Sequence, residues 1–393
     1  MAALYLHNRR KTLVSFALLS LVFSLDDGYA QTMHHQVVNV SSLLPSASCT
    51  PSSPTKPNVL NHTKILVEDQ SRVNSIRSKI SMSSSNNTNK GGSLGGSKAT
   101  VLAKLGISFD LLEPSKITLI LDTGSDLTWT QCKPCSFCYP QSEPIFDPSD
   151  SWSYVSTPCT SPVSRGSGSG ISTSCSGSTC NYLIFYSDLS LSSGKLVTEA
   201  LTLTSMDVIE NFQFGCGGFN CGHFGEVAGV LGLARDGLSI VGKTVTKYGQ
   251  YFSYCLPSSS SSTGFLAFGK TSETPKSSTF TLIATIHESS LFYGIKIVEI
   301  TVAGTKLQIP STVFLKARAI IVSGTVITRL PPKAYNAMRT AFQKEMVRYK
   351  RAKSFEILET CYDLHNTNDD IDIIIYGNVQ QKTFEVIYDV AGG

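Results

Sequence analysis

The chain has 393 residues, a length that suits two domains together with processing segments. Hydrophobic residues make up 41% of it and charged residues only 16%, which indicates a β-rich globular protein with a weakly charged surface. The formal net charge of +4 is spread without a basic tract, so the clustered Lys and Arg that nucleic-acid binding requires are missing.

Residues 1–30 have the organisation of a secretory signal peptide. A positive end at Arg9–Lys11 precedes an apolar stretch, Thr12–Leu25, that is too short to span a bilayer. Gly28–Ala30 then offers small residues at the spacing expected for cleavage. A membrane anchor or a buried helix is the alternative interpretation. We expect cleavage after residue 30 and entry into the secretory route.

Residues 31–99 are rich in Ser, Asn, Thr and Lys and end in a Gly-rich linker. The segment carries three glycosylation sequons, at Asn39, Asn61 and Asn86. Its composition fits either a disordered N-terminal tail or a prosegment that is removed on activation. We expect a prosegment with a linker.

From Lys98 onward, short apolar runs alternate with Gly, Ser and Pro, the pattern of an all-β chain. The expected strands are Ile117–Leu121, Asn181–Tyr186, Glu210–Phe214, Gly264–Gly269, Phe292–Val302 and Glu385–Tyr388. A helix is expected after Pro331, where apolar residues recur at helical spacing, and a second short helix after Gly237.

The stretch from residue 119 to residue 132 carries the strongest chemical signal. An apolar run delivers Asp122 into a turn, and Trp129 follows. The turn consists of Thr123, Gly124 and Ser125. A carboxylate at the end of a buried strand is unfavourable unless hydrogen bonds hold it, and these turn residues can supply such bonds.

Residues 319–328 nearly repeat this stretch. The second copy keeps the apolar run and the turn residues Ser323, Gly324 and Thr325. Val322, however, stands where the carboxylate is expected. The half-repeat indicates two related lobes that divide near residues 269–276.

Eleven cysteines in a chain with a secretory signal indicate disulfides. The candidates are Cys132, Cys135, Cys138, Cys159, Cys175, Cys180, Cys216, Cys255 and Cys361. Zinc binding at the Cys-x-x-Cys formed by Cys132 and Cys135 is the rival interpretation. Connectivity cannot be read from the sequence, and the odd total leaves at least one thiol.

Taken together, these motifs resemble the pepsin-like aspartic proteases, and more closely their plant nepenthesin-like branch. The resemblance rests on Asp122–Cys132, Cys135, Cys138, Tyr139–Gln141, Phe146–Ser149, Phe214–Gly217, Gly229–Leu233, Phe252–Cys255 and Tyr376–Lys382. It implies a mostly β, two-lobed pepsin-like fold, with an N-terminal lobe at 100–270 that carries Asp122 and a C-terminal lobe at 271–393. It favours disulfides over zinc, and it implies no cofactor and no metal.

The resemblance also implies the chemistry. In this family two carboxylates share one proton, activate a water and protonate the peptide carbonyl. Asp122 matches the first carboxylate, and Val322 occupies the position of the second. Ser323 and Thr325 are too weakly acidic to replace it. Loss of a general acid–base group lowers the rate by roughly 10²–10⁴, so we expect an inactive or strongly impaired enzyme.

Tyr186 matches the tyrosine of the family's flap, a hairpin that closes over the substrate, and Trp129 is expected near it. Read without the family, Tyr186 is simply a strand aromatic. The family usually has Gly where Ser187 stands, which alters the expected flap tip.

The C-terminal lobe departs from the family pattern. Only nine residues separate Asp363 from Ile373, where the family places several strands and a cysteine, and we expect an incomplete, truncated lobe. The functional interpretation is a secreted aspartic-type endopeptidase homologue in the cell wall or apoplast, or in the vacuole. It would be a monomer that takes a peptide or protein substrate between its lobes and needs neither nucleic acid nor membrane. The alternatives are a non-catalytic peptide-binding pseudo-protease and a degenerate product of a faulty gene model.

Overall fold

The computed structural model describes residues 36–41, 70, 107–109, 116–162, 171–186, 190–204, 207–222, 224–256, 263–270, 282–284, 291–295, 297–316, 319–325, 328–354, 360–363 and 385–390. The strands are β1 (Gln36–Ser41), β2 (Ile107–Phe109), β3 (Lys116–Ile117), β4 (Leu119–Asp122), β5 (Trp129–Gln131), β6 (Val155–Ser156), β7 (Ile171–Ser176), β8 (Thr179–Phe185), β9 (Leu191–Thr204), β10 (Asp207–Cys221), β11 (Gly229–Gly232), β12 (Tyr251–Cys255), β13 (Thr263–Phe268), β14 (Tyr293–Ile295), β15 (Thr301–Val302), β16 (Thr305–Lys306), β17 (Ala319–Ile321), β18 (Lys350–Ala352), β19 (Cys361–Asp363) and β20 (Glu385–Asp389). The helices are the 3-10 turn η1 (Pro148–Asp150), α2 (Ile240–Lys243), α3 (Val245–Tyr248), α4 (Ser311–Lys316) and α5 (Pro332–Glu345).

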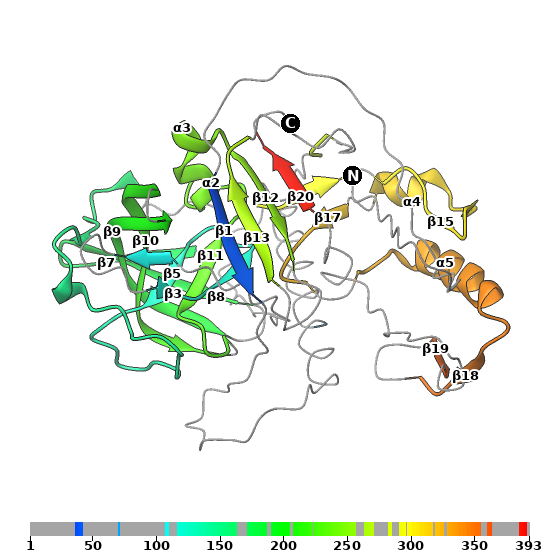
Figure 1. The fold of residues 1–393 in the computed structure, drawn as a ribbon, viewed down its shortest axis with the longest axis horizontal. Helices are drawn as coiled ribbons and strands as arrows, with labels where there is room; N and C mark the ends of the chain where they lie inside the picture. The colour runs from blue at the N-terminus through cyan, green and yellow to red at the C-terminus, as the bar shows by residue number, and fades with distance from the viewer. Residues whose placement is uncertain are drawn as a thin grey trace.

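The fold is mostly β, as the sequence predicts, and its largest unit is a ten-stranded sheet (Figure 1). The main order in this sheet is β3-β2-β9-β10-β5-β11-β4, with β6 and β8 added along β9 and β7 paired with β8. β4 and β11 run parallel, so that Asp122 at the end of β4 lies opposite Gly232. β11 pairs antiparallel with β5, which places Val230 beside Trp129. The sheet therefore brings the Asp122 turn and Trp129 to neighbouring strands.

A second, four-stranded sheet gathers distant parts of the chain in the order β1-β13-β12-β20. Within the segment expected to be a prosegment, Gln36–Ser41 form a strand that pairs along its length with Thr263–Phe268, which disagrees with the alternative of a disordered tail at these residues. β20, near the end of the chain, pairs with β12 rather than with strands of the second half. Figure 1 shows these four strands side by side in the middle of the molecule.

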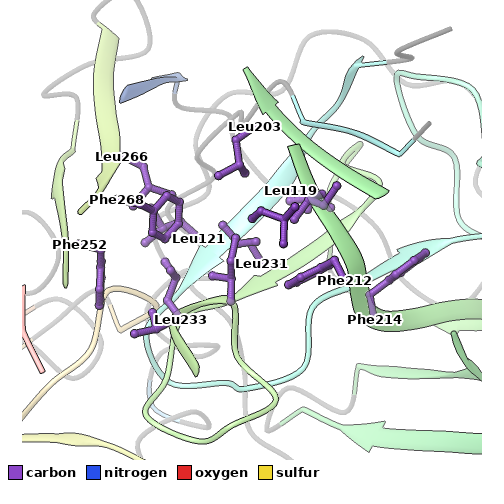
Figure 2. Packing of buried hydrophobic residues seen from close by; sticks show 14 of the residues in the cluster. Leu119, Leu121, Leu203, Phe212, Phe214, Leu231, Leu233, Phe252, Leu266 and Phe268 are labelled. Atoms are coloured by element: carbon purple, nitrogen blue, oxygen red, sulfur yellow. The ribbon is translucent and has the colours of Figure 1, made fainter. Parts of the chain in front are cut away.

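The main hydrophobic core lies between the two sheets. Figure 2 shows leucines of the β4 and β11 region packed with residues of β9, β10, β12 and β13: Leu119, Leu121, Leu231, Leu233, Leu203, Phe212, Phe214, Phe252, Leu266 and Phe268. Tyr388 of β20 closes this core, and its ring stacks on Phe252 with centroids 4.5 Å apart. The turn that follows Asp122 thus begins at the end of a strand, β4, whose leucines are part of this core.

The second half of the chain is more broken up. The sequence predicts one strand over Phe292–Val302, but the structure has the short strands β14 and β15 there. β15 ends in a hairpin with β16, because Ala303 and Gly304 both adopt positive φ, as a two-residue hairpin turn requires. α5 begins at Pro332, directly after Pro331 as predicted. Two short helices, α2 and α3, follow Gly237, where the sequence predicts one.

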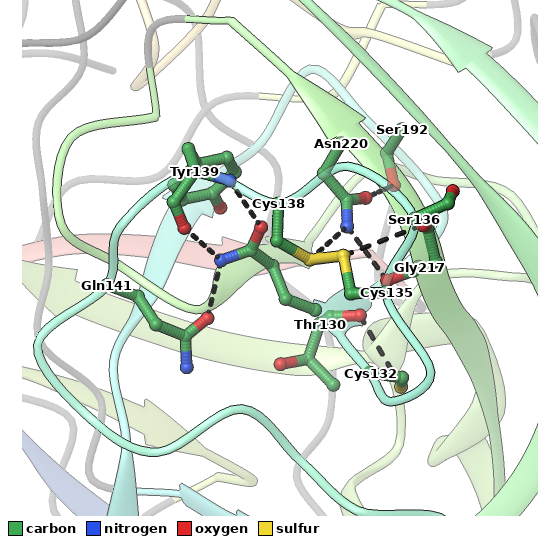
Figure 3. Close-up of a disulfide and its surroundings, with 12 residues drawn as sticks. Thr130, Cys132, Cys135, Ser136, Cys138, Tyr139, Gln141, Ser192, Gly217 and Asn220 are labelled. Carbon is green, nitrogen blue, oxygen red and sulfur yellow. Dashed lines mark hydrogen bonds between the residues drawn. A yellow bond between two sulfur atoms is a disulfide. The ribbon is translucent and has the colours of Figure 1, made fainter. Parts of the chain in front are cut away.

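Three disulfides are described: Cys132–Cys216, Cys135–Cys138 (Figure 3) and Cys159–Cys175. Cys221, which the sequence analysis did not include among the candidates, is also half of a disulfide.

Three of the disulfide candidates are wrong. Cys180 is a buried thiol, because Cys175, its partner across the β7–β8 hairpin, is already joined to Cys159. Cys255 and Cys361 are also thiols. They lie in β12 and β19, which Figure 1 places in well-separated parts of the molecule.

Asn39 lies in β1, opposite Phe265 of β13. Asn61 and Asn86 lie outside the described residues.

Candidate active site

Asp122 ends strand β4 and is almost fully buried, with 2% of its surface exposed. One carboxylate oxygen, Oδ1, accepts a hydrogen bond from the backbone N–H of Gly124 at 3.0 Å. The other, Oδ2, accepts from the hydroxyl of Ser125 at 2.8 Å. Donors of this kind stabilise the ionised form of a buried carboxyl group. The turn therefore supplies a hydrogen-bond donor to each oxygen of the carboxyl group at the end of an apolar strand, as the sequence predicts.

Val322 lies just after β17, at the start of the second turn, and is 6% exposed. It belongs to a small apolar cluster with Ala234, Leu291 and Phe292, against which Ile320 also packs. The backbone N–H of Thr325 approaches the Val322 carbonyl at 3.4 Å, so that the segment turns back as the first one does. The position that would carry the second carboxylate is thus filled by an aliphatic side chain.

The two turns are joined directly, although they lie 200 residues apart in sequence. The backbone N–H of Thr123 donates to the Ser323 hydroxyl at 3.1 Å, and the backbone N–H of Ser323 donates to the Thr123 hydroxyl at 2.9 Å. The Ser323 hydroxyl also reaches the Leu121 carbonyl at 3.3 Å. Thr123 and Ser323 are both fully buried. This reciprocal arrangement brings Asp122 and Val322 to equivalent places on facing turns.

Close backbone packing behind the first turn depends on two glycines of β11. A side-chain carbon at Gly229 would lie 2.0 Å from the Trp129 carbonyl, and one at Gly232 would lie 2.0 Å from the Asp126 carbonyl. Both distances are far below van der Waals contact, so only glycine fits at either position. The motif Gly229–Leu233 therefore braces the Asp122 turn.

Tyr186 lies directly after β8, and its hydroxyl accepts a hydrogen bond from the Trp129 indole N–H at 2.5 Å. Both side chains meet Phe224 edge-on, at centroid distances of 4.9 Å for Trp129 and 5.6 Å for Tyr186. The structure therefore places these two residues together, as the family's flap would require. Ser187 lies outside the described residues.

Sequence reasoning did not count three residues of this region among the site residues: Tyr139, Phe224 and Tyr388. The Tyr388 hydroxyl contacts the Thr123 side chain, and its ring lies in the core. Burial raises the pKa of Tyr388, so the phenol stays protonated beside the Asp122 turn. No local signal could have found it, since β20 reaches β12 only through the fold.

Among the residues that the structure describes, no group of three or more His, Cys, Asp or Glu side chains is placed to hold a metal ion. In the same part of the chain, no helix has both the length and the apolar character needed to cross a membrane.

Comparisons with known proteins agree with this geometry. Residues 107–270 match the family model described as xylanase inhibitor N-terminal, and residues 292–373 match the one described as xylanase inhibitor C-terminal. An aspartyl protease family protein of Arabidopsis thaliana is 44% identical in an alignment 388 positions long that covers 85% of this chain and 81% of the relative. Aspartic proteinase nepenthesin-2 of Nepenthes gracilis is 33% identical in an alignment 324 positions long that covers 70% of this chain and 72% of that protein.

A solved structure supports the fold alone. The crystal structure of basic 7S globulin from soybean aligns with a TM-score of 0.52 at 15% identity, covering 75% of this chain and 90% of the globulin. The sequence matches, the two facing turns and the mostly β architecture agree with one another. The chain belongs to the plant branch of the pepsin-like aspartic protease family.

Proposed function

We propose that this protein is an aspartic-type endopeptidase homologue that binds a peptide or protein chain between its two turns but does not hydrolyse it as a single chain. The observation that carries the proposal is Val322, buried at the place that faces Asp122 across the Thr123–Ser323 hydrogen bonds. The Asp122 turn has hydrogen-bond donors to both carboxyl oxygens, and the second turn has a similar backbone turn without the acid.

The chemical argument concerns proton supply. A water held by the Asp122 carboxylate can lose its proton to that carboxylate. The carbonyl oxygen of the scissile peptide must gain a proton in the same step, and two carboxylates that share one proton provide this. Val322 has no proton to give. The hydroxyls of Ser323 and Thr123 already bond to backbone groups or to each other.

The remaining architecture favours binding over loss of function altogether. Trp129, Tyr186 and Phe224 keep their mutual packing, and the Asp122 turn keeps its hydrogen bonds. In a degenerate chain without a function, nothing would favour retention of this aromatic packing or of the Asp122 hydrogen bonds. We therefore favour the peptide-binding alternative over the degenerate one.

Secretion belongs to the same proposal. The basic and apolar segments within residues 1–30 support it, and so do the three disulfides, because disulfides form and persist in oxidising compartments. The first residue of the secreted protein, read by N-terminal sequencing, tests this part. An intact Met1 would contradict it.

The test of the function separates binding from turnover. Binding of pepstatin, and of peptides derived from a denatured protein, to the purified protein is measured by calorimetry at acidic pH. Cleavage of the same peptides is followed by mass spectrometry. We expect saturable binding with no new peptide ends. Pepstatin-sensitive cleavage would refute the inactivity, and absence of any binding would refute the peptide-binding function.

A further inference from the structure

A buried tyrosine of β20 reaches the active-site turns through its hydroxyl. Tyr388 is 4% exposed, and hydrogen bonds join its phenol to the side chain of Thr123 and to the hydroxyl of Tyr254, the latter at 3.1 Å. Thr123 in turn takes part in the reciprocal hydrogen bonds with Ser323 that join the two turns. We call these Thr123–Ser323 hydrogen bonds the turn clamp. One hydroxyl of β20 is therefore linked to the residue that follows Asp122.

The Tyr388 ring is held in place by the core. Tyr388 lies opposite Phe252 in the β12–β20 pairing, and the two rings stack with centroids 4.5 Å apart. Tyr293 also packs against the Tyr388 ring, at 4.6 Å. The Tyr293 hydroxyl donates to the Leu233 carbonyl at 2.7 Å, and the Leu233 N–H donates to the Asp122 carbonyl at 3.0 Å. The support of the Tyr388 ring is thus itself bonded to the first turn.

Packing of the core does not require a hydroxyl at position 388. Phe252, the cross-strand neighbour, makes the same stacking contact with an unsubstituted ring. A hydroxyl inside an apolar core is unfavourable unless it is hydrogen-bonded, and here it bonds to Thr123 and Tyr254. The Thr123 hydroxyl also accepts from the Ser323 N–H, at 2.9 Å. The phenol of Tyr388 therefore restrains the side chain with which the first turn holds the second.

We propose that Tyr388 is a positioning residue, whose hydroxyl restrains the turn clamp and so keeps the Asp122 turn and the Val322 turn in the arrangement that the peptide binds. This inference rests on the proposed peptide-binding function. A restraint that is already present in the free protein reduces the ordering that a ligand must bring about when it binds. Tyr254 lies one step farther from the turns, because its hydroxyl bonds to that of Tyr388.

The experiment compares Tyr388→Phe with the matched control Tyr254→Phe. Each variant removes one phenolic oxygen from the same buried pair and keeps the ring that packs in the core. Residue-resolved hydrogen exchange compares the Thr123 and Ser323 amides, both of which donate in the turn clamp, with amides of the β9–β10 ladder. Thermal melting of both variants shows whether the fold as a whole is retained.

We expect the effect to be local and confined to Tyr388→Phe. Exchange of the Thr123 and Ser323 amides should become about two- to tenfold faster than in the wild type, the range that one net hydrogen bond corresponds to, while the β9–β10 amides change little. The dissociation constant of a peptide that binds the wild type, measured by calorimetry, should rise by about the same factor. Tyr254→Phe should leave both the amide exchange of the turn clamp and the peptide affinity close to those of the wild type.

Equal effects of the two variants on the Thr123 and Ser323 amides would overturn the inference, because the phenols would then act only through the stability of the core. So would a Tyr388→Phe variant that binds peptide as tightly as the wild type, or one that fails to fold while Tyr254→Phe folds. Each of these results leaves the proposed function intact. Absence of peptide binding by the wild type would refute the proposed function, and with it the role of Tyr388 in binding.

Discussion

Replacement of Val322 by Asp is the sharpest test of why this protein should not hydrolyse peptides. The substitution puts a carboxyl group on the second turn, opposite Asp122, while Ser323 keeps its hydrogen bonds to Thr123. By analogy with the first turn, where Gly124 and Ser125 hold Asp122, we expect the backbone N–H of Gly324 and the Thr325 hydroxyl to donate to the new carboxyl group. The variant would restore a pair of carboxyl groups able to share one proton.

The change in stability can be bounded from the surroundings of Val322. Its side chain is 6% exposed and packs with Ala234 and Phe292, and burial of a valine contributes about 1.5–3 kcal/mol. Two new hydrogen bonds to the carboxyl group would return about 0.5–1.5 kcal/mol each. From these two terms alone the net loss is at most about 2 kcal/mol, against a usual domain stability of about 5–15 kcal/mol, and the burial of a second acid close to Asp122 adds to that loss. The rate of peptide cleavage should rise by roughly 10²–10⁴-fold, the factor attributed to one general acid–base group.

The assay follows cleavage of a fluorogenic peptide and of a denatured protein at acidic pH, with and without pepstatin. Val322→Asn is the matched control, because its amide has nearly the shape of the carboxyl group but no acidic proton to share. The double variant Val322→Asp with Asp122→Asn removes the other half of the pair and should be inactive again. Pepstatin-sensitive cleavage by the unmodified protein, purified free of other proteases, would refute the reasoning about Val322. So would a well-folded Val322→Asp that shows no activity.

Three further predictions follow from the described contacts. Ser323→Ala should lower the free energy of unfolding by about 1–3 kcal/mol in urea titrations, because it leaves the buried Thr123 N–H without its acceptor; the exposed control Ser172→Ala should change it little. Cys180 should resist alkylation in the native protein and react once it is unfolded without reductant, and a disulfide found at Cys180 would contradict the assignment. The contribution of Tyr388 to stability should be constant up to about pH 10 and be lost above it, because burial raises the pKa of Tyr388 in the folded state while unfolded tyrosine titrates near 10. Tyr388→Phe should weaken that alkaline loss, which pH-dependent denaturation would reveal.

The parts of the site that lie within one short stretch were predictable from sequence. The Asp122 turn, the apolar strand before it and the helix after Pro331 follow from local rules, since each depends on residues within a few positions of one another. The place of Val322 was also predictable, because the half-repeat aligns the second turn with the first. Such signals need no knowledge of how distant segments pack.

The parts that depend on distant contacts were not predictable. β1 pairs with β13 across more than 200 residues, and β20 pairs with β12, yet neither edge carries a local mark of its partner. Cys180 illustrates the same limit, because its neighbour Cys175 could only be assigned to Cys159 once the β7–β8 hairpin was known. The burial of the Tyr139 hydroxyl could likewise not be predicted, because it depends on the packing of the ring on Phe224.

The geometry explains how the chain can carry valine at position 322 and keep its fold. The two turns are joined by Thr123 and Ser323, whose hydrogen bonds take no part in proton transfer. A pair of like-charged carboxyl groups close together is itself destabilising, because both cannot ionise. Valine at 322 removes that repulsion and adds apolar contact with Phe292. Valine at position 322 therefore removes the proposed proton donor and at the same time favours the folded state.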